Sequence, residues 1–133
     1  TLKEGVEMVI SALKKSIGGE LFVPKIPSYR ILDVANAIGP KCELKKIGIR
    51  PGEKIHEEMI TAADSCNTFD IGNNYVILPN NPSLEAKFRE NNSSFKKVPE
   101  GFSYNSFNNK HYLTIQEIRE LIKKHIDPNF KPL

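Results

Sequence analysis

The sequence predicts an α/β fold, and three observations lead to that prediction. Apolar residues recur at helical spacing in several runs, and a capping box opens the first and the last of them, at Thr1 and at Thr114. Short apolar runs rich in β-branched and aromatic residues lie between the helical runs. The resulting order of helix, strand, helix, strand, short helix, strands, loop and helix is typical of a few short strands covered by helices.

The composition indicates one globular domain. The chain has 133 residues, of which 39% are hydrophobic and 26% charged, and its net charge is +3. That charge is too small to indicate a nucleic-acid partner, and no apolar run approaches the ~20 residues that cross a membrane. Cys42, Cys66 and three scattered histidines indicate reduced thiols, with no disulfide framework and no metal site. We therefore expect a cytoplasmic protein without a nucleic-acid or membrane partner.

The first half of the chain contains two predicted helices and two predicted strands. A helix is expected over residues 2–16, ended by a Gly-Gly pair, and a short strand over residues 20–23. Ser28 is placed to cap a second helix, whose apolar face runs from Ile31 to Ile38. A second strand is expected over residues 44–49.

The second half begins with a Pro-Gly turn, after which the pattern predicts a short helix with Glu53 in its first turn. Residues 69–71 and 75–78 read as two strands of a hairpin. Residues 80–112 are rich in Asn, Ser, Pro and Lys, and we expect a long, largely irregular excursion there, pinned by aromatic residues. A last helix follows Thr114.

Three side chains are candidates for binding a ligand. Arg50 follows a predicted strand and precedes Pro-Gly, so its guanidinium is held where it suits phosphate, although the same pattern fits a surface arginine. Glu53 is a candidate acceptor for sugar hydroxyls, or simply a carboxylate at a helix N-terminus. Lys25, between two prolines, is a candidate for an anion contact or a solvated lysine.

No residue is predicted to be catalytic. His56 and Glu57 are neighbours on a predicted helix, and neighbours on a helix do not face each other. The cysteines lack an adjacent base, and no serine lies in a nucleophile elbow. A glycine-rich dinucleotide fingerprint is also absent, because the Gly-Gly pair precedes a strand instead of following one. The residues alone therefore support an anion-binding or sugar-nucleotide-binding subdomain with no visible reaction.

Two long motifs carry a family resemblance over essentially the whole chain. The segments Gly18 to Ser28 and Ile47 to Ile60 resemble the C-terminal part of the inverting UDP-N-acetylglucosamine 4,6-dehydratases, which are extended short-chain dehydrogenases/reductases. The resemblance continues through Asn74 to Pro79 and through Tyr104 to Asn108 before the last helix. It implies that residues 1–133 are a single C-terminal substrate-binding region whose Rossmann core lies elsewhere.

The resemblance also implies a reaction. The intact enzyme would bind NADP or NAD in its Rossmann domain, oxidise the sugar at C4, eliminate water across C5–C6 and return the hydride at C6 with inversion at C5. The product is a 4-keto-6-deoxy sugar nucleotide for surface polysaccharide or flagellin glycans. Arg50 matches an arginine on the diphosphate, Glu53 an acidic residue near the uridine ribose, and Lys25 a residue of the substrate cleft. The acid, base and Tyr-x-x-x-Lys residues of the family lie upstream of Thr1.

Two alternatives stay open. One is a UDP-sugar 4-epimerase of the same family, and the other is a non-catalytic module that binds UDP-sugars or docks to a partner. The form of the segment from Arg50 to Glu57 is closest to the dehydratase of pseudaminic acid synthesis. Because the chain opens inside a helical pattern without Met, we expect a piece of a longer protein. The resemblance implies that the intact enzyme forms a homo-oligomer. Residues 80–97 match nothing in the family.

Overall fold

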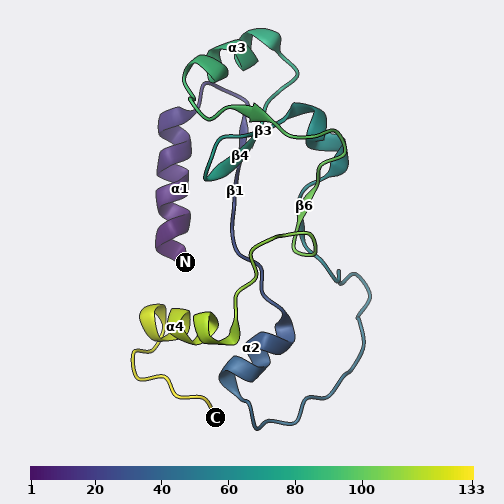
Figure 1. Ribbon diagram of the computed structural model, residues 1–133, viewed down its shortest axis with the longest axis vertical. Coiled ribbons are helices and arrows are strands. Elements are labelled where there is room, and N and C mark those ends of the chain that lie inside the picture. The colour runs from purple at the N-terminus through teal and green to yellow at the C-terminus, as the bar shows by residue number, and fades with distance from the viewer. The chain divides into compact units, whose positions relative to one another are not determined.

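The computed structural model describes residues 1–133 and has the predicted α/β fold (Figure 1). It contains four α-helices, one 3₁₀ helix and six short strands. It divides into two compact units, which we describe separately: Thr1–Lys25 with Glu58–Asn105, and Ile26–Glu57 with Ser106–Leu133. In chain order the elements are α1 (Leu2–Lys15), β1 (Leu21–Pro24), α2 (Ile31–Ile38), β2 (Glu58–Ile60), η1 (Ala62–Asn67), β3 (Thr68–Asp70), β4 (Asn74–Ile77), α3 (Pro82–Glu90), β5 (Lys96–Lys97), β6 (Tyr104–Asn105) and α4 (Ile115–His125).

A four-stranded antiparallel sheet forms the centre of the first unit. Its strand order is β1-β4-β3-β5, and β3 and β4 are the predicted hairpin, paired from Thr68 with Ile77 to Asp70 with Tyr75. Phe88 of α3 is fully buried against this sheet, in one cluster with Phe69 and Val76. Burying such aromatic rings is the main favourable term for a unit of this size.

A second, two-stranded sheet in the same unit pairs β2 with β6. Ile60 of β2 is fully buried and packs with Val23 and Tyr104, and the rings of Tyr75 and Phe102 lie against this cluster. The 3₁₀ helix η1 leads from β2 to β3, and Ser65 in it accepts a hydrogen bond from the N–H of Gly101 at 3.0 Å. These contacts join the chain after β2 to the loop before β6.

The second unit is built on the helices α2 and α4. The guanidinium of Arg119 in α4 donates hydrogen bonds to the backbone carbonyls of Ala37 (3.0 Å) and Asn36 (3.1 Å) at the end of α2. The predicted capping box opens α4, because Glu117 Oε2 accepts from the N–H and the hydroxyl of Thr114. A parallel bridge between Ser28 and Tyr112 links the two chain segments that lead into these helices.

The predicted strand over residues 44–49 is wrong. The structure has no regular element between α2 and β2, and Leu44, Ile47 and Ile49 are all exposed. A strand needs a neighbour to take its backbone hydrogen bonds, and nothing in the chain pairs with this run. The alternation of apolar residues therefore indicates extended backbone, but it does not show whether a second strand is available to pair with it.

The predicted short helix after Pro-Gly is also wrong. Residues 53–57 are irregular, Ile55 is 80% exposed, and the chain then forms strand β2. Ile55, Met59 and Ile60 fit a helical spacing, but Ile60 is buried because β2 pairs with β6. The helix that the chain does form after this strand is η1, which begins at Ala62.

Two further expectations need correction. Ser28 does not cap α2, whose N-cap is Arg30, and Ser28 instead donates its N–H to His111 O and accepts at its carbonyl from the N–H of Leu113. Residues 80–112 are more ordered than expected, because they contain α3 as well as β5 and β6. Asn81 caps α3 and Pro82 starts it, a pairing that favours a helix start.

No helix of the structure has the length and apolar character that a bilayer crossing requires. No three His, Cys, Asp or Glu side chains gather in a way that would hold a metal ion. Cys42 and Cys66 are both free thiols at the surface.

Candidate functional site

The candidate site is a tight turn formed by Arg50, Pro51, Gly52 and Glu53. The N–H of Glu53 donates to the carbonyl of Arg50 at 3.1 Å, and Gly52 has φ +84°. Proline at the second position and a glycine with positive φ at the third are typical of a type II turn. A side chain on Gly52 would meet no neighbouring atom, so the requirement for glycine is one of backbone conformation.

The Glu53 side chain closes the same turn from the other side. Its Oε2 accepts a hydrogen bond from the backbone N–H of Arg50 at 2.7 Å, and its Oε1 lies 3.9 Å from Arg50 Nε. The Arg50 side chain is 72% exposed and the Glu53 side chain 48%. The turn therefore fixes the backbone of Arg50 and leaves most of the guanidinium facing solvent.

The segment around this turn is basic. Residues 44–57 carry four cationic side chains, Lys45, Lys46, Arg50 and Lys54, against the two carboxylates of Glu53 and Glu57. All of these residues are exposed. Such a local excess of positive charge favours the approach of an anion.

His56 and Glu57 are anchored but do not form an acid–base pair. The imidazole of His56 packs against the ring of Phe107, with centroids 4.8 Å apart. Glu57 is held through its backbone, since its N–H donates to Ser106 Oγ at 3.1 Å and its carbonyl accepts from the N–H of Ser106 at 2.8 Å. These contacts fix the end of the segment that carries the Arg50 turn.

Lys25 lies in the other unit and has a carboxylate partner of its own. Its Nζ is 2.7 Å from Asp70 Oδ1 and 4.5 Å from the centre of the Tyr75 ring. The same Asp70 oxygen accepts from the N–H of Gly72 at 2.9 Å. The lysine therefore ties the end of β1 to the β3–β4 hairpin. Arg50 and Glu53 lie together in one unit, and Lys25 belongs to the other.

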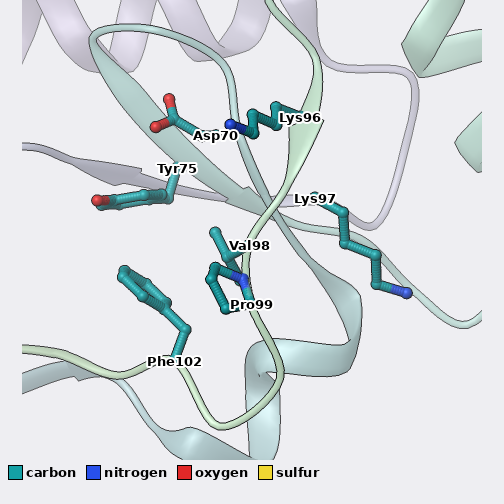
Figure 2. Close-up of a pocket in the computed structure, with 7 residues that line it drawn as sticks. All are labelled: Asp70, Tyr75, Lys96, Lys97, Val98, Pro99 and Phe102. Atoms are coloured by element: carbon teal, nitrogen blue, oxygen red, sulfur yellow. The ribbon is translucent and has the colours of Figure 1, made fainter.

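A small pocket of about 160 Å³ lies beside Lys25's partner Asp70 (Figure 2). Its lining residues are Asp70, Tyr75, Lys96, Lys97, Val98, Pro99 and Phe102. Figure 2 shows Lys96 extending toward Asp70 while Lys97 points away.

Burial in this region raises the pKa of the Tyr75 phenol, an effect that the nearby Lys25 opposes and Asp70 supports. The pocket volume falls below the ~300–1,000 Å³ of typical small-molecule sites. We therefore assign no ligand to the pocket. The sequence did not predict it, because the lysines that line it, Lys96 and Lys97, lie in the region expected to be irregular.

The described residues do not fit a nicotinamide cofactor. Such a cofactor needs a glycine-rich turn that follows a strand and opens a helix, so that backbone N–H groups meet the pyrophosphate. The connections from β1 to α2 and from β4 to α3 contain no glycine. These two connections therefore lack the turn that would hold the pyrophosphate of such a cofactor.

Comparison with known proteins identifies the family. Residues 1–79 match the model of a family described as polysaccharide biosynthesis protein. The chain belongs to this family. It is 41% identical over 129 residues to an inverting UDP-N-acetylglucosamine 4,6-dehydratase of Campylobacter jejuni subsp. jejuni serotype O:2, a match that covers 92% of the chain and 38% of that relative. These matches confirm the family resemblance that the sequence motifs indicate.

Other relatives carry a different name. The chain is 33% identical over 127 residues to a UDP-glucose 4-epimerase of Rickettsia felis, covering 92% of the chain and 36% of the epimerase. Among solved structures it is similar to Pen from Bacillus thuringiensis, with a TM-score of 0.73, 25% identity, and coverage of 93% of this chain and 37% of the other. The chain thus spans about two fifths of the length of the proteins it matches.

Proposed function

We propose that these 133 residues are the UDP-sugar-binding part of a UDP-N-acetylglucosamine 4,6-dehydratase. The observation that carries this proposal is the closed Arg50 turn, which presents an exposed guanidinium from a basic segment. The 41% identity to a dehydratase supports the choice of substrate class. The match of the segment from Arg50 to Glu57 to the pseudaminic acid type favours a dehydratase of that pathway.

Arg50 is proposed to hold the diphosphate. Its planar fork of N–H donors matches phosphate oxygens, and a charge-assisted hydrogen bond of this kind is worth ~1.5–3 kcal/mol. Glu53 stands next to it as the candidate for hydroxyl groups. A ligand oxygen would have to compete with Asp70 for the ammonium of Lys25, so Lys25 contributes less to the proposed site than Arg50.

The intact enzyme is proposed to use NADP or NAD for hydride removal and return, held by a Rossmann domain outside these residues. The exposed apolar side chains of α1 and of residues 44–55 support a larger fold that covers them. A homo-oligomer is part of the proposal and rests on the family resemblance alone, whereas the proposed cytoplasmic location rests on the two free thiols. The chain's own residues bind and orient the nucleotide.

A UDP-sugar 4-epimerase is the second candidate, favoured by the 33% identity to an enzyme of that name. The two reactions differ in their products, because a dehydratase removes water from the sugar, whereas an epimerase only inverts the configuration at C4. The residues described here leave both open, since both would bind a UDP-sugar through the same turn.

The test is to incubate the full-length protein with UDP-N-acetylglucosamine and NADP and to follow the sugar by NMR. We expect a 4-keto-6-deoxy product with inverted C5. A C4 epimer without loss of water would instead establish the epimerase. Binding of the UDP-sugar without any conversion would favour the non-catalytic module.

A further inference from the structure

The helix α1 carries an apolar stripe that lies in solvent. Its members recur at helical spacing along α1 and just past its end, and their exposed fractions run from 37% to 87%: Leu2, Val6, Val9, Ile10, Leu13 and Ile17. No residue of α1 is buried. A contiguous exposed apolar surface is uncommon on a soluble protein and marks a contact with another apolar surface.

The stripe does not face the side of α1 that the chain shields. The half-buried residues of α1 are Met8, Ser11 and Ala12. Because each residue of a helix turns by about 100°, the mean direction of these three side chains lies roughly opposite to that of the stripe. The large aliphatic side chains of α1 are therefore left for a partner outside the unit to which the helix belongs.

The charges of α1 argue against a lipid surface as this partner. Three lysines and two glutamates lie along the helix: Lys3, Glu4, Glu7, Lys14 and Lys15. A helix that lies on an anionic membrane carries a polar face rich in Lys and Arg, whereas carboxylates occupy the polar side of the first two turns of α1. The stripe therefore fits an apolar protein surface better than a bilayer.

The length of the relatives favours a partner within the same polypeptide. The chain covers 38% of the Campylobacter jejuni dehydratase and 37% of Pen, so more than half of each of these proteins lies outside the matched part. A surface on the same polypeptide meets α1 at a high effective concentration, because the covalent link makes the contact intramolecular. A second copy of the chain has no such advantage.

We propose that the stripe of α1 packs against the remainder of the intact protein and is the main apolar contact between residues 1–133 and that remainder. This proposal deepens the proposed function, in which these residues are one part of a larger enzyme. The receiving surface is apolar and grooved, because the side-chain ridges of a helix pack into grooves of their partner. The contact is a permanent one, since six aliphatic side chains form an interface that resembles half of a domain core.

Thiol alkylation of the full-length protein tests whether the stripe is covered. Leu13→Cys and Glu7→Cys are compared in a background whose native cysteines are replaced by serine. Both positions are exposed in residues 1–133, at 73% for Leu13 and 62% for the Glu7 side chain, so without a partner they should react alike. If the remainder covers the stripe, iodoacetamide should label Leu13→Cys at least about 30-fold more slowly than Glu7→Cys, because labelling then requires local opening.

Labelling rates within about 3-fold of each other would overturn the proposal, because both side chains would then be in solvent in the intact protein. Val9→Cys gives the same readout from a second position of the stripe, at 59% exposure, and replaces Leu13→Cys if that variant fails to fold. The control position lies on the same helix, so loss of α1 itself would speed labelling at both positions.

Photo-cross-linking identifies what covers the stripe. A benzophenone amino acid in place of Leu13 should cross-link to a peptide outside residues 1–133, in a product that keeps the mass of one chain on a denaturing gel. A product with the mass of two chains would overturn the proposal in favour of a second copy.

These readouts do not depend on nucleotide binding, so they separate this proposal from the proposed function. A protected stripe in a protein that neither binds nor converts UDP-N-acetylglucosamine would support the contact of α1 and contradict the proposed function. An exposed stripe in a protein that forms the 4-keto-6-deoxy product would do the reverse.

Discussion

Single carboxylates close backbone turns at several points of this chain. Glu4, Asp64 and Glu117 each accept from an N–H three residues earlier, within capping boxes. Glu53 and Glu20 do the same without a capping threonine, toward Arg50 and Ile17. The spacing of three was readable from the sequence at all five positions. The sequence predicted it only at Thr1 and Thr114, where a threonine is followed three residues later by a glutamate, whereas Thr61 is followed by an aspartate.

Glu20 gives this pattern a pH dependence. Desolvation by burial would raise the pKa of its carboxyl, but hydrogen bonds from the N–H groups of Ile17 and Gly18 and from Ser16 outweigh it, so the pKa lies below its ordinary value of 4.5. The stabilisation is then fully present above pH 4.5 and is lost as the pH falls through the folded-state pKa.

Glu20→Gln should therefore be less stable than wild type at pH 7, and the difference should shrink as the pH drops below 4.5. Urea unfolding at a series of pH values measures this, with Glu7→Gln at an exposed position of α1 as the control. A difference that stays constant from pH 7 to pH 3 would show that the carboxylate charge at position 20 contributes nothing.

The ion pair of Lys25 could not be predicted from the sequence. Its partner Asp70 is 45 residues away in the chain, and no local pattern indicates the ion pair. The Arg50 turn was predictable because Pro-Gly and its neighbours are adjacent in sequence. The sequence therefore predicts contacts between residues that are adjacent in the chain, but not ion pairs between residues far apart in it.

At the scale of elements, α1 and α4 show that the same apolar periodicity can have different outcomes. Both begin with a capping box and both carry an apolar stripe. Ile118 of α4 is 7% exposed, whereas α1 buries no residue and Leu13 is 73% exposed. Periodicity predicted both helices correctly, but it does not say whether the chain provides a surface to cover the stripe.

This difference predicts unequal costs for matched truncations in the 133-residue chain. Ile118→Ala should lower the free energy of unfolding by ~2–5 kcal/mol, because it removes buried methyl groups. Leu13→Ala should change it by no more than ~0.5 kcal/mol, because its side chain is already in water. Urea denaturation of both variants checks this, and comparable losses would mean that α1 is packed in solution.

The strand expected over residues 44–49 failed for a related reason. Apolar alternation around Lys45 and Lys46 fits a strand, yet a strand exists only with a pairing partner. The hairpin of β3 and β4 succeeded because each strand supplies the other's partner within ten residues. The α3 helix was missed although Asn81 and Pro82 mark its start, because its composition is polar.

At the scale of the whole molecule, the fold class and the family followed from the sequence, whereas the division into two units did not. The contacts that define each unit join segments far apart in the chain, such as Arg119 with Ala37 and Tyr104 with Ile60. Pattern reasoning has no access to such contacts, since it works within a window of neighbouring residues.

The share of its relatives that the chain spans leads to a prediction about binding. It covers 38% of the length of the dehydratase relative, and the nucleotide site is proposed to need the remainder. Calorimetry on the isolated 133 residues should therefore detect weak or no UDP-sugar binding. Micromolar affinity together with turnover by this chain alone would contradict the proposal that it is only the substrate-binding part.

The most direct measurement concerns the guanidinium of Arg50 in the full-length protein. If it binds the diphosphate, Arg50→Ala should lower kcat/KM for UDP-N-acetylglucosamine about 10-fold or more, which corresponds to ~1.5–3 kcal/mol of lost transition-state binding. Lys41→Ala, which removes an exposed cation outside residues 44–57, should leave kcat/KM within about 3-fold. Unchanged kinetics for Arg50→Ala would contradict the assignment of this turn as the nucleotide-binding site.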